Sequence, residues 1–314
     1  MKSLRVSRSW SAALAAVGGS GLVGVMPLAA LHIYADGLSA PSMLFWRYAI
    51  AILALGTAAT LAGLKLSLAW RHKTWRVVLL GGTLGAGQTL CFWESIKTLE
   101  TSMAVLLFYT YPAVTLAIDR LVFRQKVRPL ALLCIGAILC GAALITGPGL
   151  HRGAVDPRGL AWAIPAPLLY AVYLALNTRL LRRHPALIGA TGLYIGMAIT
   201  FGTMSAWLGL DIPKSAAGWA LLLFIGLGPG AVTMTLFTYS VPRLGASSFP
   251  ILANTELVVV VSIGVLVLGE PMTAWRAIGG VLIVAGVVTH ALARRPVPAP
   301  VRSATAAAHA EPAG

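Results

Sequence analysis

The amino-acid sequence predicts an all-α integral membrane protein with ten transmembrane helices, arranged as two inverted five-helix repeats. Three observations lead to this prediction: the composition, the spacing of long apolar runs and an internal duplication. Of the 314 residues, 58% are hydrophobic and only 11% are charged, whereas soluble proteins are about 45–50% apolar and about 25% charged. Polar residues are therefore too few to cover a water-facing surface of this size.

Ten apolar runs have roughly the 17–25 residues that a helix needs to cross the hydrocarbon core of a bilayer. Helices are expected because each backbone polar group must find its partner within the segment when lipid surrounds it. The connecting loops are short and leave no room for a soluble domain. The approximate bounds of the runs are 11–31, 42–63, 77–97, 101–119, 130–148, 159–177, 186–208, 217–239, 247–268 and 274–292.

The chain therefore divides into four parts. Residues 1–10 form a cytoplasmic N-terminus, residues 11–149 the first repeat, residues 159–293 the second repeat, and residues 296–314 a Pro- and Ala-rich tail that we expect to be disordered and cytoplasmic. A cleaved signal peptide is the alternative for the N-terminus. Its apolar core is typically about 7–15 residues, whereas the apolar region here continues to Ile33, which favours a retained first helix.

The net charge of +15 would suggest a nucleic-acid partner in a soluble protein. Here 18 of the 24 Lys and Arg residues fall on the side of the N-terminus, five fall on the opposite side, and Arg47 alone lies inside a span. This asymmetry follows the positive-inside rule. It predicts a multi-pass protein of the cell (inner) membrane with both termini in the cytoplasm and no nucleic-acid partner.

The internal duplication appears when the chain is shifted by 145 positions. Residues 81–125 then align with residues 226–270 without a gap, and 13 of the 45 pairs are identical. Each half holds five spans, so the second half enters the membrane from the opposite side. Inverted repeats of this kind are common in secondary transporters, whose binding sites lie near the bilayer midplane between the halves.

Two stretches carry a family resemblance, "SIKTLETSMAVLLFYTYPAVTLAIDRLVF" and "ILANTELVVVVSIGVLVLGEPMTAWRAIGGVLIVAG". With "APSMLFWRYAIAILAL" and "GLAWAIPAPLLYAVYLALNTRLLRR" they resemble the EamA family of the drug/metabolite transporter superfamily, over about residues 11–293. The resemblance implies a secondary active transporter that exports small metabolites or amino acids. The sequence departs from the family at Arg124-Gln125, where a Gly-Glu pair is usual, and at Leu257, which replaces a proline.

Glu256 is the main candidate for the transport chemistry. It lies in the middle of the ninth run, and the duplication pairs it with Tyr111, so both would approach one central space. A carboxylate inside the membrane is costly, and it can bind a proton or a substrate ammonium. A purely structural carboxylate, hydrogen-bonded or paired with Arg47, is the alternative. Asn254, two residues before Glu256 on the same run, is a further candidate.

Other polar side chains within the spans are candidates for substrate binding or coupling. Arg47 can bind a substrate carboxylate, or it can reach the membrane surface or pair with Glu94. Gln88 and its repeat partner Thr233 can line a wet cavity or bond between helices. Tyr170 and Tyr173 share a helix face and can stack on a substrate or fill the core.

Small residues and prolines mark possible hinges or close helix packing. Helix packing is the main alternative for the glycines, which recur at equivalent positions of the two halves. The candidates are Gly81, Gly85, Gly226, Gly230, Pro112 and Pro229.

The sequence shows no pattern for enzymatic chemistry. Its histidines lie at span ends, in loops or in the tail, and it has neither a metal-ligand cluster nor a glycine-rich phosphate loop with lysine. We therefore expect no enzyme activity, no metal and no cofactor. The expected partners are a small-molecule substrate, H⁺ and the lipid bilayer, in a monomer or a homodimer. Alternative functions are a lipid-carrier flippase or translocation subunit, and a membrane scaffold that transports nothing.

Overall fold

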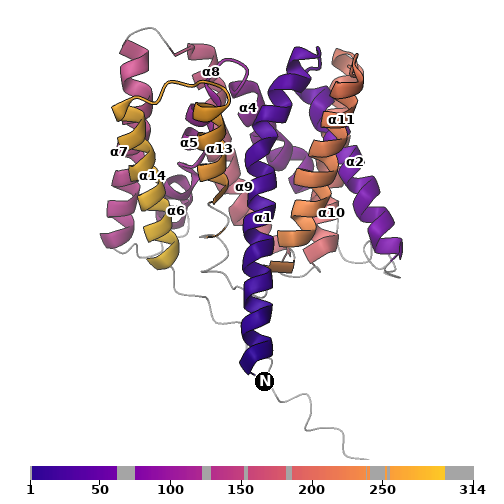
Figure 1. Cartoon of the computed structure of the whole chain (residues 1–314), viewed down its shortest axis with the longest axis horizontal. Helices are drawn as coiled ribbons and strands as arrows, with labels where there is room; N and C mark the ends of the chain where they lie inside the picture. Colours follow the sequence, from indigo (N-terminus) through magenta and orange to yellow (C-terminus); the bar gives the residue numbers. More distant parts are fainter. Residues whose placement is uncertain are drawn as a thin grey trace, which may run out of the picture.

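The structure is a computed structural model that describes residues 2–61, 75–121, 129–151, 155–181, 186–237, 239–240, 252 and 255–293, and none of these residues lies in a strand. Figure 1 shows the helices side by side as a bundle. The elements are α1 (Lys2–Ala35), α2 (Ala40–Leu61), α3 (Trp75–Leu80), the π-helix η2 (Gly81–Gly85), α4 (Ala86–Ser95), α5 (Thr101–Phe108), α6 (Tyr111–Leu121), α7 (Pro129–His151), α8 (Pro157–Ala163), α9 (Pro165–Leu181), α10 (Ala186–Leu208), α11 (Ala216–Ile225), the π-helix η3 (Gly226–Val232), α13 (Thr255–Leu266) and α14 (Ala274–Ala293).

Helical segments lie on each of the ten predicted apolar runs. The predicted run 186–208 coincides with α10, and the predicted run 274–292 ends one residue before α14 does. The beginning of the ninth run, with Asn254, lies outside the described residues. Within the described part of the chain, four helices are long and apolar enough to cross a membrane: Trp10–Ala35, Ala40–Leu61, Pro157–Asn177 and Ala216–Phe237.

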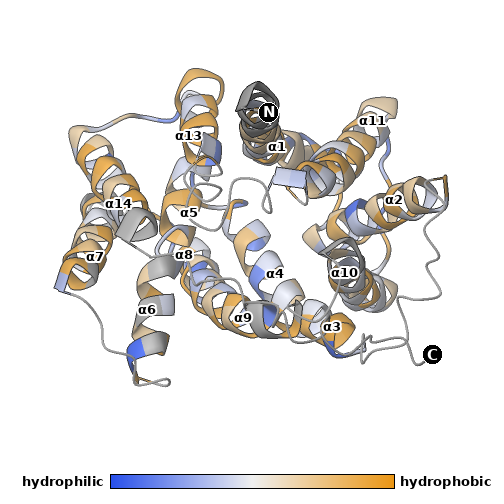
Figure 2. Cartoon of the chain, turned by 90° about the horizontal axis from the view of Figure 1, so that it is seen from below, coloured by the Kyte–Doolittle hydropathy of each residue, from blue (hydrophilic) through white to orange (hydrophobic). Residues whose placement is uncertain are grey.

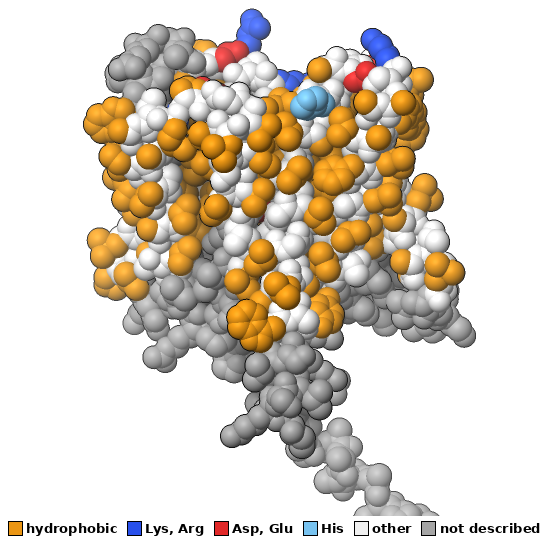
Figure 3. All heavy atoms as spheres, viewed as in Figure 1, with side chains coloured by type: hydrophobic (Ala, Val, Ile, Leu, Met, Phe, Trp, Pro, Cys, Tyr) orange, Lys and Arg blue, Asp and Glu red, His pale blue; other side chains and the backbone are white. Residues whose placement is uncertain are grey.

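The outer surface of the bundle is that of a membrane protein. Large hydrophobic side chains are exposed along several helices, for example Leu53 on α2, Leu133 on α7 and Val281 on α14. Figure 3 shows hydrophobic side chains over the sides of the bundle, with Lys and Arg gathered at its upper end. A soluble monomer seldom exposes apolar surface on this scale.

Local sequence signals explain where the helices begin and end. Asp156 caps α8 by accepting a hydrogen bond from the Arg158 amide at 2.8 Å, with Pro157 as the first helical residue. Ser215 caps α11 in the same way, through the Gly218 amide at 2.9 Å. Gly209 follows α10 with a φ of +101°, a left-handed conformation that glycine adopts without steric cost.

The two halves of the chain make matching contacts. The duplication relates α1 to α8–α9, α2 to α10, α3–η2–α4 to α11–η3, α5–α6 to α13, and α7 to α14. The contact of α1 with α13 therefore has its counterpart in the contact of α9 with α6. In the same way, the contact of α2 with η3 corresponds to the contact of α10 with η2. All four contacts are present. The contacts of α2 with α10 and of α7 with α14 map onto themselves. Figure 2 shows α7 beside α14, and α2 beside α10, from below.

The buried core lies where the halves meet. It includes Met43 and Leu44 of α2, Phe201 of α10, and Leu222 and Ile225 of α11, each with no measurable solvent exposure. Side chains from both halves contribute to this core. The buried core holds the central helices together. The polar side chains described below lie on neighbouring faces of these helices.

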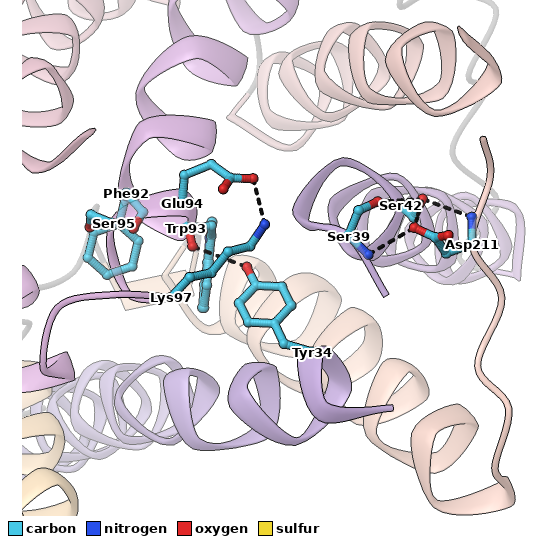
Figure 4. Close-up of polar contacts among 9 residues, drawn as sticks. All are labelled: Tyr34, Ser39, Ser42, Phe92, Trp93, Glu94, Ser95, Lys97 and Asp211. Carbon is cyan, nitrogen blue, oxygen red and sulfur yellow. Dashed lines mark hydrogen bonds and ion pairs between the residues drawn. The ribbon is translucent and has the colours of Figure 1, made fainter. Parts of the chain in front are cut away.

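Connections between helices are tied together at the end of the bundle that carries the exposed charges. Asp211 accepts hydrogen bonds from the Ser39 amide at 2.9 Å and the Ser42 hydroxyl at 3.2 Å, and Lys97 pairs with Glu94 at 2.8 Å. Figure 4 shows both groups, together with the bond from Tyr34 to the Trp93 carbonyl. The contacts of Asp211 and Tyr34 join segments that are far apart in sequence, whereas the pair of Lys97 and Glu94 is local.

A second set of contacts at this end fastens α5 to the segment between α13 and α14. The Glu270 carboxylate accepts hydrogen bonds from the amides of Thr101 at 2.7 Å and Ser102 at 3.1 Å, and also from the Ser102 hydroxyl. Arg276 forms an ion pair with Glu100. The carboxylate of Glu270 thus satisfies two of the free amides at the N-terminus of α5, where negative charge is favourable.

Candidate functional site

Five aromatic side chains from both halves form one group, which we call the aromatic cluster: Phe108, Tyr109, Tyr111, Tyr170 and Tyr173. The ring of Tyr170 lies 4.8 Å from that of Tyr111 and 4.9 Å from that of Phe108, between centroids. Tyr170 also stacks on Tyr173 at 5.9 Å. These are the distances of interacting aromatic pairs, so α5, α6 and α9 meet through their rings.

Glu256, at the start of α13, lies beside the aromatic cluster. Its carboxylate accepts a hydrogen bond from the Tyr109 hydroxyl, and its charge interacts with Tyr170 and with Arg47. Tyr170 thus interacts both with Glu256 and with its repeat partner Tyr111. A carboxylate within a membrane helix needs such partners because lipid offers it none.

Arg47 of α2 interacts with the same region. Its guanidinium lies 5.0 Å from the centre of the Tyr48 ring, and its charge interacts with Glu256 and Tyr194. The Nε atom is buried and makes no hydrogen bond with the described residues. Among the described residues, no ion pair joins Arg47 to Glu94, whose carboxylate pairs with Lys97 at 2.8 Å. The Arg47 fork therefore keeps a donor for an anionic group.

The remaining sequence-predicted polar candidates are placed differently. Gln88 donates a hydrogen bond to its neighbour Thr89 at 2.6 Å. Thr233 is 3% exposed and donates to the Gly19 carbonyl at 3.2 Å, so it joins two helices, the second of the alternatives for this residue. Asn254 and the side chain of Pro112 lie outside what the structure describes.

The predicted glycines coincide with two π-helices at equivalent positions of the repeat. Residues 81–85 form η2 and residues 226–232 form η3, which contains Pro229. A Cβ at Gly81 would collide with the backbone of Leu193 in α10, and a Cβ at Gly226 would lie 2.7 Å from Ile50 in α2. Both π-helices therefore pack closely against the central pair α2 and α10. Short π-helices within α-helices often mark functional sites.

Hydroxyl groups of α10 bind carbonyls in both π-helices. Thr200 donates to the Gly82 carbonyl at 2.6 Å, and Tyr194 donates to the Gly230 carbonyl at 3.4 Å. These hydroxyl groups add side-chain hydrogen bonds to carbonyls of the two π-helices. The irregular backbone is thereby buried in protein, as membrane helices require.

Sequence reasoning missed four aromatic residues of this region. Phe108 and Tyr109 come directly before the predicted Tyr111, and Tyr48 follows Arg47. Tyr194 packs against Tyr48, with 5.1 Å between the centroids of the two rings. The run "FYTYP" at 108–112 could have indicated these residues, because three aromatic residues so close together in a membrane span can contact more than one neighbouring helix. Within the described residues, no group of three His, Cys, Asp or Glu side chains could hold a metal ion.

One family model matches both halves of the chain, and the curated relatives are transporters. The model of the EamA-like transporter family matches residues 10–147 and again residues 157–291. An uncharacterized transporter of Archaeoglobus fulgidus is 29% identical over 201 residues, which cover 62% of this chain and 68% of the relative. The threonine/homoserine exporter RhtA of Salmonella typhimurium is 29% identical over 242 residues, covering 74% of this chain and 77% of the exporter.

A solved crystal structure supports the same fold. It superposes with a TM-score of 0.62 at 18% identity and covers 89% of this chain and 97% of its own chain. Two matches of the family model, one in each half, agree with the internal duplication seen in the sequence. This chain is an integral membrane protein that belongs to the EamA-like transporter family.

Proposed function

We propose that this protein is a secondary active transporter that exports small metabolites or amino acids across the cell (inner) membrane by alternating access. Ten spans in two inverted halves, with both termini in the cytoplasm, form the proposed architecture. Figure 1 supports the inversion: α1 rises from the N-terminus, whereas α8 and α9 run downward from the opposite end. The matching contacts of the two halves support it as well.

The observation that carries the proposal is the hydrogen bond from Tyr109 to Glu256. Tyr109 belongs to the first repeat and Glu256 to the second, so rocking one half against the other would change this contact. Transporters with inverted repeats bind substrate between their halves. The aromatic cluster and Arg47, which interact with Glu256, extend the site.

The chemistry of the site suits a zwitterion. Glu256 and the faces of the surrounding rings can hold an ammonium group, by charge and by cation–π attraction. The free Nε–H of Arg47 can donate to a carboxylate. An amino acid carries both groups, and the aromatic rings provide apolar contacts for its side chain. The name of the Salmonella relative, a threonine/homoserine exporter, suggests the first compounds to try.

Proton coupling is part of the proposal. A proton and a substrate ammonium would compete for the Glu256 carboxylate, so that only one is carried at a time. Entry of a proton from outside would then displace the substrate outward. We assign the hinge role to η2 and η3, because both π-helices bear directly on the central helices α2 and α10.

Substrate exchange in proteoliposomes tests the proposal. Purified protein is reconstituted in vesicles that contain unlabelled threonine, homoserine or another amino acid, and entry of the same labelled compound is followed. Wild type should exchange at least one compound well above protein-free vesicles. Glu256→Gln should fall to the protein-free level, since the amide carries no charge for an ammonium or a proton.

Glu94→Gln is the matched control, because this carboxylate is paired with Lys97 at the end of the bundle. It should retain wild-type exchange. Equal rates for Glu256→Gln and wild type would overturn the assigned role of Glu256. If no amino acid exchanges with any variant, a screen of metabolites in the medium of expressing cells decides between another cargo and a protein that transports nothing.

A further inference from the structure

An apolar cavity of about 590 Å³ lies between α5, α13 and α14, apart from the aromatic cluster. The two helices α13 and α14 are neighbours in sequence, but each packs mainly on other elements: α13 on α1 and α5, and α14 on α7. Figure 2 shows α13 and α14 apart at one side of the bundle, with α5 behind the space. In the first half, by contrast, both α5 and α6 pack on α7.

The cavity opens on the side of the bundle that faces lipid. Val258 of α13 and Val281 of α14 both line it and are 62% and 67% exposed. Its inner wall includes Leu106 of α5 and Val261 of α13. A space with such walls gains nothing from water, which needs several polar partners to be held. Within the hydrocarbon core it fits an acyl chain.

The length of the cavity matches one leaflet. The lining residues of α14 run from Arg276 to Val288, a rise of about 18 Å along a helix. Half of the hydrocarbon core measures about 15 Å. The cavity therefore accepts one acyl chain, which would enter from the end of the bundle where Arg276 lies and end near the bilayer midplane.

Arg276 provides a cation at the mouth of this cavity. Its Nη1 donates to the Pro271 carbonyl at 2.8 Å and pairs with Glu100. A guanidinium carries five N–H donors, so others remain for a phosphate. Trp275 beside it is 53% exposed, as expected of a tryptophan at headgroup level. The Glu270 carboxylate nearby accepts hydrogen bonds from the backbone amides at the start of α5.

We propose that this cavity binds a membrane phospholipid, with one acyl chain between α13 and α14 and the phosphate at Arg276. The site differs from the proposed substrate site, because Glu256 and the aromatic cluster do not line it. An acyl chain bound here would fill the space between α13, α5 and α14 and stabilise the position of α13. Lipid bound at this place would therefore influence the helix that carries Glu256.

Native mass spectrometry of the purified protein tests the site. The probes are phosphatidylethanolamine, phosphatidylglycerol and a diacylglycerol with the same chains and no phosphate. Gly280→Leu fills the cavity, since a Cβ at Gly280 meets only Leu106 at 3.9 Å. Gly136→Leu on α7 is the matched control, because nothing lies within 4 Å of its Cβ. Arg276→Gln removes the cation.

The wild type and Gly136→Leu should each retain one tightly held phospholipid more than Gly280→Leu. Arg276→Gln should bind both phospholipids about tenfold more weakly, which corresponds to loss of one charge-assisted hydrogen bond, and diacylglycerol as before. Preference between the two phospholipids identifies which headgroup the site takes. Equal retention by wild type and Gly280→Leu would overturn the acyl-chain site.

Two further comparisons keep the test decisive. An equal loss of phospholipid and diacylglycerol in Arg276→Gln would overturn the phosphate contact. If Gly280→Leu does not yield folded protein, Val281→Trp replaces it, because this exposed position lies on the same wall and tolerates a larger side chain. Leu133→Trp on α7, which is 71% exposed, is then the control.

Discussion

The Tyr109 hydroxyl donates a hydrogen bond to the Glu256 carboxylate, and the two residues come from opposite halves of a duplicated chain. Tyr109 is 6% exposed, so water does not replace this donor readily. Because the two groups belong to different halves, a movement of one half against the other would change this contact.

Removing the Tyr109 hydroxyl should impair transport, although the Glu256 carboxylate remains. In Tyr109→Phe the ring still packs in the aromatic cluster, but Glu256 loses its hydroxyl partner. We expect initial exchange rates in proteoliposomes to fall by about tenfold or more, in line with the strength of a charge-assisted hydrogen bond.

Tyr34→Phe is the control for this variant. Its hydroxyl donates to the Trp93 carbonyl at 3.3 Å, away from Glu256, so exchange should stay at the wild-type level. Equal effects of the two substitutions would mean that the Tyr109 hydroxyl has no special place in transport.

Arg47→Lys should weaken substrate binding although the positive charge is kept. A lysine ammonium has no planar fork and cannot place a donor where the free Nε–H of Arg47 lies. We expect a higher KM for an amino-acid substrate and a smaller change in maximal rate. Arg158→Lys, at the exposed start of α8, should leave both unchanged. A wild-type KM in Arg47→Lys would argue for a purely structural guanidinium.

Alanine substitutions should separate packing glycines from exposed ones. A Cβ at Gly81 meets the backbone of Leu193, which cannot move aside easily, whereas a Cβ at Gly226 meets the Ile50 side chain at 2.7 Å. Overpacking typically costs about 1–3 kcal/mol. Gly81→Ala should therefore lower the thermal unfolding midpoint most, followed by Gly226→Ala.

The control for these glycines is Gly136→Ala on α7, where the new methyl group meets nothing within 4 Å. Its midpoint should equal or exceed that of wild type, because alanine favours helix more than glycine does. The measurement is the loss of monodisperse protein in detergent on heating. A midpoint for Gly81→Ala above that of Gly136→Ala would contradict the close packing of η2 on α10.

Asp211 should contribute a pH-dependent part of the stability. Hydrogen bonds from the Ser39 side chain and amide hold the pKa of Asp211 below its usual value of 3.8, with a smaller contribution from Ser42. A lowered pKa in the folded state stabilises the protein above the unfolded pKa. This contribution is lost as the pH falls through the folded value, below about pH 4.

The unfolding midpoint measured across this pH range checks the prediction. Asp211→Asn should be less stable than wild type at neutral pH, and the difference should shrink as the medium becomes acidic. Asp156→Asn is a useful comparison because it caps α8 without joining distant loops. A difference between Asp211→Asn and wild type that grows toward acidic pH would contradict the assignment.

Much of the fold could be predicted from the sequence because membrane insertion is decided by local hydropathy. Runs such as 186–208 and 274–292 agree with α10 and α14 to within one residue. The duplication predicted that Gly81 and Gly226 are equivalent, and both begin a π-helix. The residue roles assigned from the sequence remain predictions for Glu256, Tyr111, Arg47 and Tyr170.

What the sequence by itself determined is the class of protein, the positions of its apolar helices, its duplication and the presence of a costly carboxylate at Glu256. Only the tertiary structure decided that Tyr109 is the partner of Glu256, that Thr233 binds Gly19, and that α13 and α14 stand apart. The physical reason lies in the helices themselves. They are apolar on all sides, so hydropathy does not reveal how each is rotated about its axis, and that rotation chooses the neighbour of every polar side chain.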